Sequence, residues 1–250
     1  MRCVGHNRYS TLVIMHVKSR KVECLDLFDP VGGLLRHSTH RSRHRANAIQ
    51  AQYSWDQFLK SHAETLWARD FFTKKVWTRY GPRTAYVLFF IHIKSRRVIA
   101  STSTTHPHSE WMAHQANVFL NAARERGLKA PSILIRDGDK KFGKAFHKVL
   151  QAADCEAKQI PRGTPVMNAH AERWVRSIKH QCLNHFVCFS DNHLDHLVEQ
   201  YLEHYHTERP HQGIENRLII PPSHPPPASG KIMCKTPLGG VLKSYSRAAA

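Results

Sequence analysis

Three acidic residues stand where their types and spacing could hold metal ions. Asp70 lies inside an apolar segment, Asp137 comes directly after another, and Glu172 follows 35 residues after Asp137, near the start of a long amphipathic segment. Carboxylate oxygens are the ligands that hard cations prefer. Two such ions about 4 Å apart would activate an attacking hydroxyl and stabilise the leaving oxygen in an in-line phosphoryl displacement.

Each acid also has an ordinary structural interpretation. Asp70 could face outward from a strand, although a charge flanked by large apolar residues is costly to bury unless it is paired or bound to a cation. Asp137 precedes Gly138 and could form a turn. Glu172 could compensate a helix dipole. The hypothesis of a metal site therefore depends on the three acids together.

The segment that carries Glu172 also carries two cations on the same face. Arg176 and Lys179 follow Glu172 at i+4 and i+7, so a helix projects all three side chains in one direction. We expect the two cations to contact DNA phosphates beside the acids. The alternative is an i,i+4 ion pair between Glu172 and Arg176, worth a few tenths of a kcal/mol.

Periodic apolar patterns predict the elements that must position these side chains. Strands are expected at residues 66–77, 85–93, 98–104, 132–135 and 157–160, and helices at 109–126, 142–152, 168–183 and 191–205. The first three strands follow one another closely, as in antiparallel hairpins, and the later ones alternate with helices. This order predicts an α/β fold of the ribonuclease H-like class, with a mixed five-stranded sheet and helices on both faces.

Four segments in this order resemble the catalytic core shared by retroviral integrases and insertion-sequence transposases. They are residues 67–72 (WARDFF), 135–142 (IRDGDKKF), 168–174 (NAHAERW) and 205–213 (YHTERPHQG). The resemblance covers about residues 56–217. It implies that Asp70, Asp137 and Glu172 are the Asp-Asp-Glu catalytic residues and metal ligands.

The resemblance further implies what such a core does and binds. The cofactor would be Mg²⁺ or Mn²⁺, as two ions, and the reaction hydrolysis and transesterification of DNA during integration or transposition. The partners would be the element ends and the target DNA, with a homo-oligomer as the active form. Asp139 competes with Asp137 as ligand, but Asp137 aligns with the acid of the family. Residues 209–211 are interpreted as a turn that ends a helix.

Composition agrees with a nucleic-acid partner. The 250 residues include 37 Lys and Arg against 19 Asp and Glu, a formal charge of +18 with the 20 histidines neutral, which favours binding of a polyanion. Residues 36–45 form a basic arm, in which Arg41, Arg43 and Arg45 are expected to contact phosphates. No apolar run approaches the roughly 20 residues of a membrane span, so no membrane partner is expected. Six cysteines without close pairing indicate a reducing cytoplasm, and the resemblance implies the bacterial cytosol, in association with the nucleoid.

The chain is expected to have three parts: a basic N-terminal region at 1–55, the core at 56–217 and a Pro-rich tail at 218–250 that is extended or disordered. Residues 1–55 lack the helix-turn-helix that such proteins carry ahead of the core, so the copy could be truncated or decayed. His37, His40 and His44 have metal-like spacings but no CxxC beside them, and a basic loop is the alternative to zinc. A remnant that only binds DNA nonspecifically and a ribonuclease H-like nuclease are the competing functions.

Overall fold

The computed structural model describes residues 57–58, 60–136, 142–159, 168–224, 227 and 229–248. The chain divides into two compact units, Met1–Ala46 and Asn47–Ala250. The first unit lies wholly outside the described residues, and with it the basic arm of Arg41, Arg43 and Arg45 and the three closely spaced histidines. Asp137 and Asp139 also lie outside them. Everything below concerns the second unit.

A mixed five-stranded sheet forms the centre of this unit. Its order is β3-β2-β1-β4-β5, in which β1 and β3 each pair antiparallel with β2, whereas β4 pairs parallel with both β1 and β5. The strands are β1 (Leu66–Thr78), β2 (Gly81–His92), β3 (Val98–Ala100), β4 (Ile133–Arg136) and β5 (Glu156–Gln159). β1 therefore has an antiparallel neighbour on one side and a parallel neighbour on the other.

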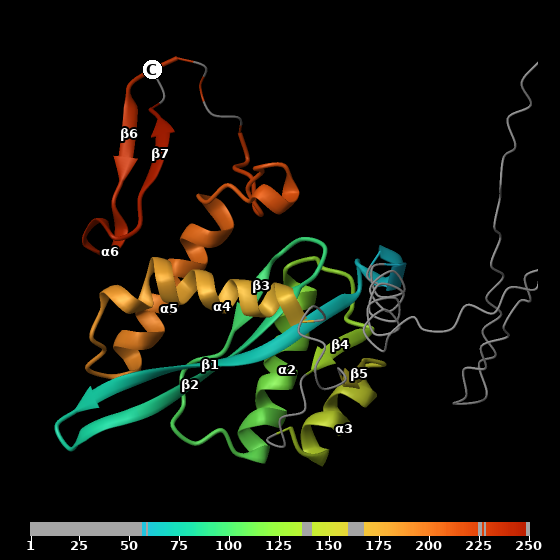
Figure 1. Ribbon diagram of the computed structural model, residues 1–250. Coiled ribbons are helices and arrows are strands. Elements are labelled where there is room, and N and C mark those ends of the chain that lie inside the picture. The colour runs from blue at the N-terminus through green and yellow to red at the C-terminus, as the bar shows by residue number, and fades with distance from the viewer. Residues whose placement is uncertain are drawn as a thin grey trace, which may run out of the picture. The chain divides into compact units, whose positions relative to one another are not determined.

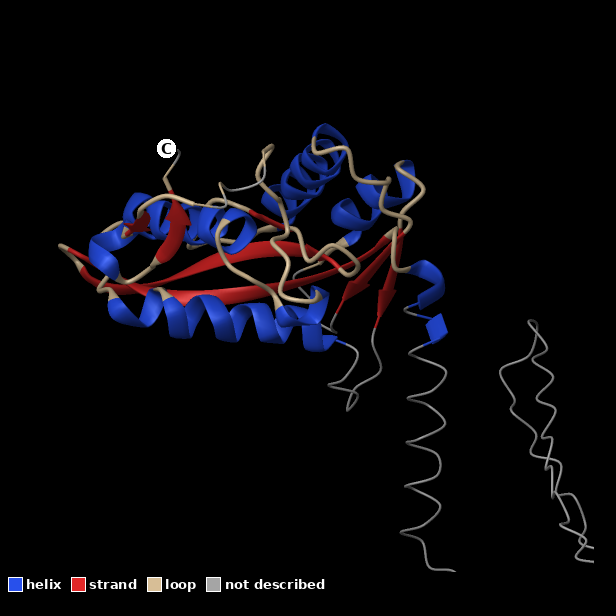
Figure 2. Ribbon diagram, turned by 90° about the horizontal axis from the view of Figure 1, so that it is seen from above, coloured by secondary structure: helices blue, strands red, loops and turns tan. Residues whose placement is uncertain are grey.

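Helices cover both faces of the sheet (Figures 1 and 2). One face packs against α2 (Ser109–Glu125) and α3 (Lys144–Ala152), and the other against α4 (Ala169–Gln181) and α5 (Asp191–Thr207). The expected ribonuclease H-like fold is confirmed. None of the helices in the described part of the chain has the length and apolar composition needed to cross a membrane.

The pleat of β1 divides its side chains between two cores. Trp67 enters the core under α2 and α3, whereas Ala68 and Phe72 enter the core under α4 and α5, because successive side chains of a strand point to opposite faces. β2 is buried almost continuously from Ala85 to His92, as expected of a central strand covered on both sides.

Local signals in the sequence set two helix ends. Gly127 adopts a φ of +64°, and a Schellman motif ends α2, in which the N–H of Leu128 donates to the Ala123 carbonyl and that of Gly127 to the Arg124 carbonyl. Ser190 caps α5, since its hydroxyl accepts the N–H of His193 at 3.0 Å.

Two expected elements are shorter than predicted. The strand from residue 98 ends at Ala100 rather than at Thr104, because the Ser101 hydroxyl accepts the Leu88 N–H at 3.1 Å and replaces a ladder carbonyl. The helix expected to reach residue 183 ends at Gln181 and is followed by a 3-10 turn, Leu183–His185.

The prediction for the C-terminal tail is wrong over its last part. Instead of an extended or disordered segment, β6 (Ile232–Lys235) and β7 (Ser244–Arg247) form an antiparallel hairpin around α6 (Pro237–Gly240). Lys235 joins this hairpin to α5 through ion pairs with Glu203 at 3.1 Å and Glu208 at 2.6 Å.

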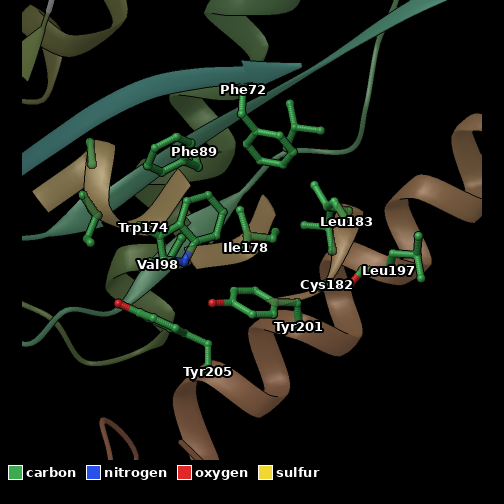
Figure 3. Packing of buried hydrophobic residues seen from close by; sticks show 14 of the residues in the cluster. Phe72, Phe89, Val98, Trp174, Ile178, Cys182, Leu183, Leu197, Tyr201 and Tyr205 are labelled. Atoms are coloured by element: carbon green, nitrogen blue, oxygen red, sulfur yellow. The ribbon is translucent and has the colours of Figure 1, made fainter. Parts of the chain in front are cut away.

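Trp174 connects α4 to the sheet (Figure 3). Its ring centroid lies 4.3 Å from that of Phe89 and 5.8 Å from that of Phe72, and it also contacts Tyr201 and Tyr205 of α5. The buried indole N–H has no hydrogen-bond partner among the residues that the structure describes. The contacts seen for this side chain are therefore those of aromatic and apolar packing.

Replacing Trp174 by Ala should lower the free energy of unfolding by about 3–5 kcal/mol, because it empties the contact between α4 and β2. Trp174→Phe should cost much less, since it keeps a ring and removes an unsatisfied donor. Urea unfolding followed by circular dichroism measures both. Equal losses for the two variants would show that ring packing is not what fixes α4.

A buried histidine links α5 to β3. The Val98 N–H donates to His206 Nε2 at 3.0 Å, which requires the neutral ring. Burial, together with the nearby Arg126 and Arg97 guanidinium groups, lowers the pKa of His206 to about 4. The ring is therefore uncharged in the folded protein at neutral pH.

This histidine should make stability fall as pH is lowered from about 6.5 to about 4, because in that interval the unfolded chain binds a proton that the folded chain does not. His206→Gln keeps an acceptor for Val98 and removes the titration, so its unfolding free energy should fall less steeply over the same interval. Urea unfolding at a series of pH values tests this. The matched control is His114→Gln, at an exposed position on α2, and identical slopes for wild type and His206→Gln would contradict the assignment.

Candidate active site

Asp70 lies within β1, partly buried, on the face covered by α4 and α5. This follows from the alternation of the strand, since Ala68 and Phe72 on either side belong to the core under those helices. Its Oδ1 accepts the N–H of Phe71 at 2.7 Å. That hydrogen bond restricts rotation of the carboxylate.

Glu172 lies in the first turn of α4 and is exposed. Two contacts show which part of β1 lies beside Glu172, that is, its level along the strand. Asp70 pairs with Phe89 of β2, and the ring of Phe89 contacts Trp174, two residues after Glu172. The two carboxylates therefore come from the same face of the sheet and from the same level of it.

The third predicted acid follows β4. This strand ends at Arg136, and its parallel pairing places Ile135 beside Ala68, so β4 ends next to the part of β1 that carries Asp70. Asp137 and its competitor Asp139 come next in the sequence but lie outside the described residues. Among the residues that are described, no cluster of three His, Cys, Asp or Glu could hold a metal ion.

Arg69 points away from the acids, as its position next to Asp70 in a strand predicts. It is fully buried on the opposite face. Its guanidinium carbon lies 2.9 Å from the ring centroid of Phe142 and 4.9 Å from that of Phe146. The guanidinium thus stacks on aromatic rings at the start of α3 and leaves the carboxylate face clear.

A partly buried cation contacts the N-terminal end of α4. Arg96, in the turn between β2 and β3, donates to Nδ1 of His170. Burial lowers the pKa of His170 to about 4, and the Arg96 and Arg173 charges add to the effect. The neutral ring accepts the guanidinium proton, so this contact holds the turn that carries Glu172 without placing a histidine charge there.

The cations predicted on α4 lie on its outer surface. Arg176 is exposed and Lys179 is partly exposed. Glu172 and Arg176 are both described, and no ion pair joins them, so the alternative interpretation of this spacing has no support in the structure. The two cations remain available to an anion beside Glu172.

Two further cations on β1 were not predicted. Lys74 and Lys75 follow Asp70 on β1, and the Lys74 ammonium donates to the Leu183 carbonyl at 2.6 Å. The signal that could have identified them is a pair of lysines within an otherwise apolar strand, because charged side chains are seldom found at such positions unless they have a partner or a function.

The last of the four sequence motifs is structural in its described contacts. His211 is buried, and its Nε2 donates to the Tyr205 carbonyl at 2.7 Å. This bond closes the chain onto the end of α5, in agreement with the interpretation of residues 209–211 as a helix-ending turn.

Comparison with known proteins adds an independent result. Residues 153–218 match a family described as "Integrase core domain"; this segment includes Glu172 and the last two motifs, but neither Asp70 nor Asp137. No curated protein matches the sequence.

Solved structures with a similar fold include two of the HTLV-2 integrase catalytic core domain in complex with magnesium. The dimeric form is 14% identical over 58% of this chain and 87% of that one, with a TM-score of 0.41. The trimeric form is 13% identical over 62% and 93%, with a TM-score of 0.47. A simian T-cell lymphotropic virus intasome in complex with a PP2A regulatory subunit is 14% identical over 74% and 67%, with a TM-score of 0.45.

The family match and the sheet order agree with the resemblance carried by the four motifs. Residues 153–218 are thus similar to an integrase core domain, and the sheet order is that of the expected ribonuclease H-like fold.

Proposed function

We propose that this protein cleaves and joins DNA strands in a metal-dependent reaction, with Asp70, Asp137 and Glu172 as its catalytic carboxylates. The observation that carries the proposal is the common level of Asp70 and Glu172 on one face of the sheet, beside the end of β4. Carboxylates from three separate elements are then available at one place.

We expect Asp137 to join the other two carboxylates because it directly follows β4 in the chain. It follows Arg136, the last residue of β4, and consecutive Cα atoms are about 3.8 Å apart. The pairing of β4 with β1 ends at Ile135 and Ala68, one residue before Arg136 and two residues before Asp70. We therefore expect Asp137, rather than the more distant Asp139, to act with Asp70.

The donor set fits Mg²⁺ or Mn²⁺, because all three ligands are carboxylates and such ions prefer oxygen. When bound, a pair of ions would activate the attacking hydroxyl and stabilise the leaving oxygen. The residues of this chain position the carboxylates. The Phe71 N–H orients the Asp70 carboxylate, and the packing of Trp174 fixes the level of Glu172 along the sheet.

DNA is the proposed partner, both as element ends and as target. Arg176 and Lys179 would contact the phosphates that flank the reacting bond, and Arg41, Arg43 and Arg45 of the basic arm would add contacts elsewhere. A reaction at two ends requires two sites, so we propose a homo-oligomer as the active form. The catalytic core would span residues 56–217.

Glu172→Gln should abolish metal-dependent strand cleavage while leaving DNA affinity near that of wild type, because the amide keeps the size of the side chain but not its charge. The measurement is nicking of supercoiled plasmid with Mg²⁺ or Mn²⁺, against an EDTA blank. Glu199→Gln, an exposed glutamate on α5, is the matched control and should nick as wild type does.

A Glu172→Gln variant that still cleaves would remove this residue from the site. Labelled donor ends added to the same assay separate strand transfer from simple cleavage: cleavage without joined product would identify a nuclease. A wild-type protein that binds DNA but never nicks it would identify a remnant.

Replacing both Arg176 and Lys179 by Ala should weaken binding to all duplex sequences alike. The slope of log affinity against log salt should fall by roughly 1.8, because each neutralised phosphate contributes about 0.9 to it. Fluorescence anisotropy at several salt concentrations measures this. Arg124→Ala with Lys148→Ala, exposed cations of α2 and α3 on the opposite face, is the control, and an unchanged slope in the first double variant would exclude α4 from the DNA interface.

A further inference from the structure

A hollow of about 410 Å³ opens along the edge of β1, beyond the point where β4 stops pairing with it. Lys74, Lys75 and Lys179 line it, and none of its lining residues is acidic. Neither Lys75 nor Lys179 takes part in an ion pair within the described part of the chain. The hollow is therefore a concentration of positive charge without internal compensation, as an anion site requires.

An aromatic side chain accompanies these charges. Trp77 lines the same hollow with 51% of its surface exposed, a large fraction for an indole. Its backbone N–H donates to the Cys188 carbonyl at 2.8 Å, and Val76 forms a parallel bridge with Cys188. These bonds fix the segment before Cys188, which forms the opposite wall, beside β1.

The hollow wraps around the strand edge. Lys75 and Trp77 lie on the face of β1 opposite to that of Asp70, as the alternation of the strand requires. Lys74 points to the α4 side, where it donates to Leu183, and Lys179 comes from α4 itself. A ligand bound there would contact ammonium groups from both faces of β1 and the Trp77 indole from one face.

We propose that this hollow binds an unpaired nucleotide of single-stranded DNA, with its phosphate on the lysines and its base against Trp77. Cations that follow the backbone and an aromatic that stacks on the base are the two parts of a single-strand site. The proposal rests on the proposed function, because the strand would reach the hollow from the catalytic carboxylates.

Two elements lead from those carboxylates to the hollow. Thr73, a lining residue, follows Asp70 by three residues of β1, about 10 Å at 3.3 Å per residue. Lys179 follows Glu172 by seven residues of α4, also about 10 Å at 1.5 Å per residue. A strand stacked at about 3.4 Å per nucleotide covers that distance in roughly three nucleotides.

An intact duplex fits these features less well. Its bases are stacked inside, so it offers phosphates to a protein surface but no free base face to an indole in a recess. An unpaired nucleotide offers both. The exposed Trp77 therefore favours a strand end or a locally opened duplex over continuous double helix.

The test compares a short fluorescent duplex bearing an oligothymidine overhang with the same duplex made blunt, in EDTA, by anisotropy with the full chain. Trp77→Ala should weaken binding of the overhang duplex by about tenfold, the effect of removing one base–aromatic stack, and leave the blunt duplex unchanged. Trp77→Phe should retain most of the affinity. Lys75→Ala should reduce the salt slope for the overhang by about 0.7.

Tyr245→Ala and Lys148→Ala, an exposed aromatic and an exposed lysine away from the hollow, are the matched controls. Equal losses on blunt and overhang DNA, or none on either, would overturn the proposal. The assay contains no metal and measures no cleavage. A protein that never nicks plasmid but keeps the Trp77-dependent preference for the overhang would thus refute the proposed function and not the hollow, and a nicking protein without that preference would do the reverse.

Discussion

The packing of Trp174 against Phe89 is the contact on which the candidate site depends. It fixes α4 at one level along the sheet, and Asp70 pairs with Phe89 at that same level. Two carboxylates repel each other, so they cannot supply their own alignment. The apolar core under α4 and α5 must supply it, and the site is as rigid as that core.

Acidic and basic side chains must occupy different parts of this surface. A protein of +18 attracts a polyanion, yet its catalytic chemistry would require acids close to the phosphates. Arg69 is buried on the far face against aromatic rings, and His170 is held neutral beside Arg96. Among the cations on the side of the carboxylates are Arg176 and Lys179 of α4 and Lys74 of β1, and in the proposed function they would contact the DNA phosphates.

The sequence predicts the strands and helices of the sheet well, because their apolar residues repeat with the periods of elements that are buried on one or both faces. It fails at β6 and β7, whose described side chains are largely exposed and carry no such alternation. That hairpin is tied to the fold through Lys235 and two glutamates of α5. Such long-range ion pairs leave no local signal, and the prolines before the hairpin suggested a disordered tail instead.

For the site, the sequence predicts which acids to consider but not their relative level, because level is a property of strand register. Asp70 and Glu172 are separated by about a hundred residues, and the pairing of Asp70 with Phe89, whose ring packs against Trp174, relates them. Lys74 and Lys75 were missed for a related reason. A strand pattern predicts that β1 is covered, whereas the structure leaves part of its edge open.

That open edge comes from the unequal lengths of neighbouring strands. β1 has 13 residues and β4 only 4, so β4 pairs with the first part of β1 and the Cys188 segment meets it again at Val76. From Thr73 to Lys75, no strand of the described residues pairs with β1 on that side. An exposed strand edge invites association with other chains unless charge opposes it, and Lys74 and Lys75 provide such charge. In the proposed function, the same lysines would disfavour pairing with a strand of another protein and favour entry of a DNA strand.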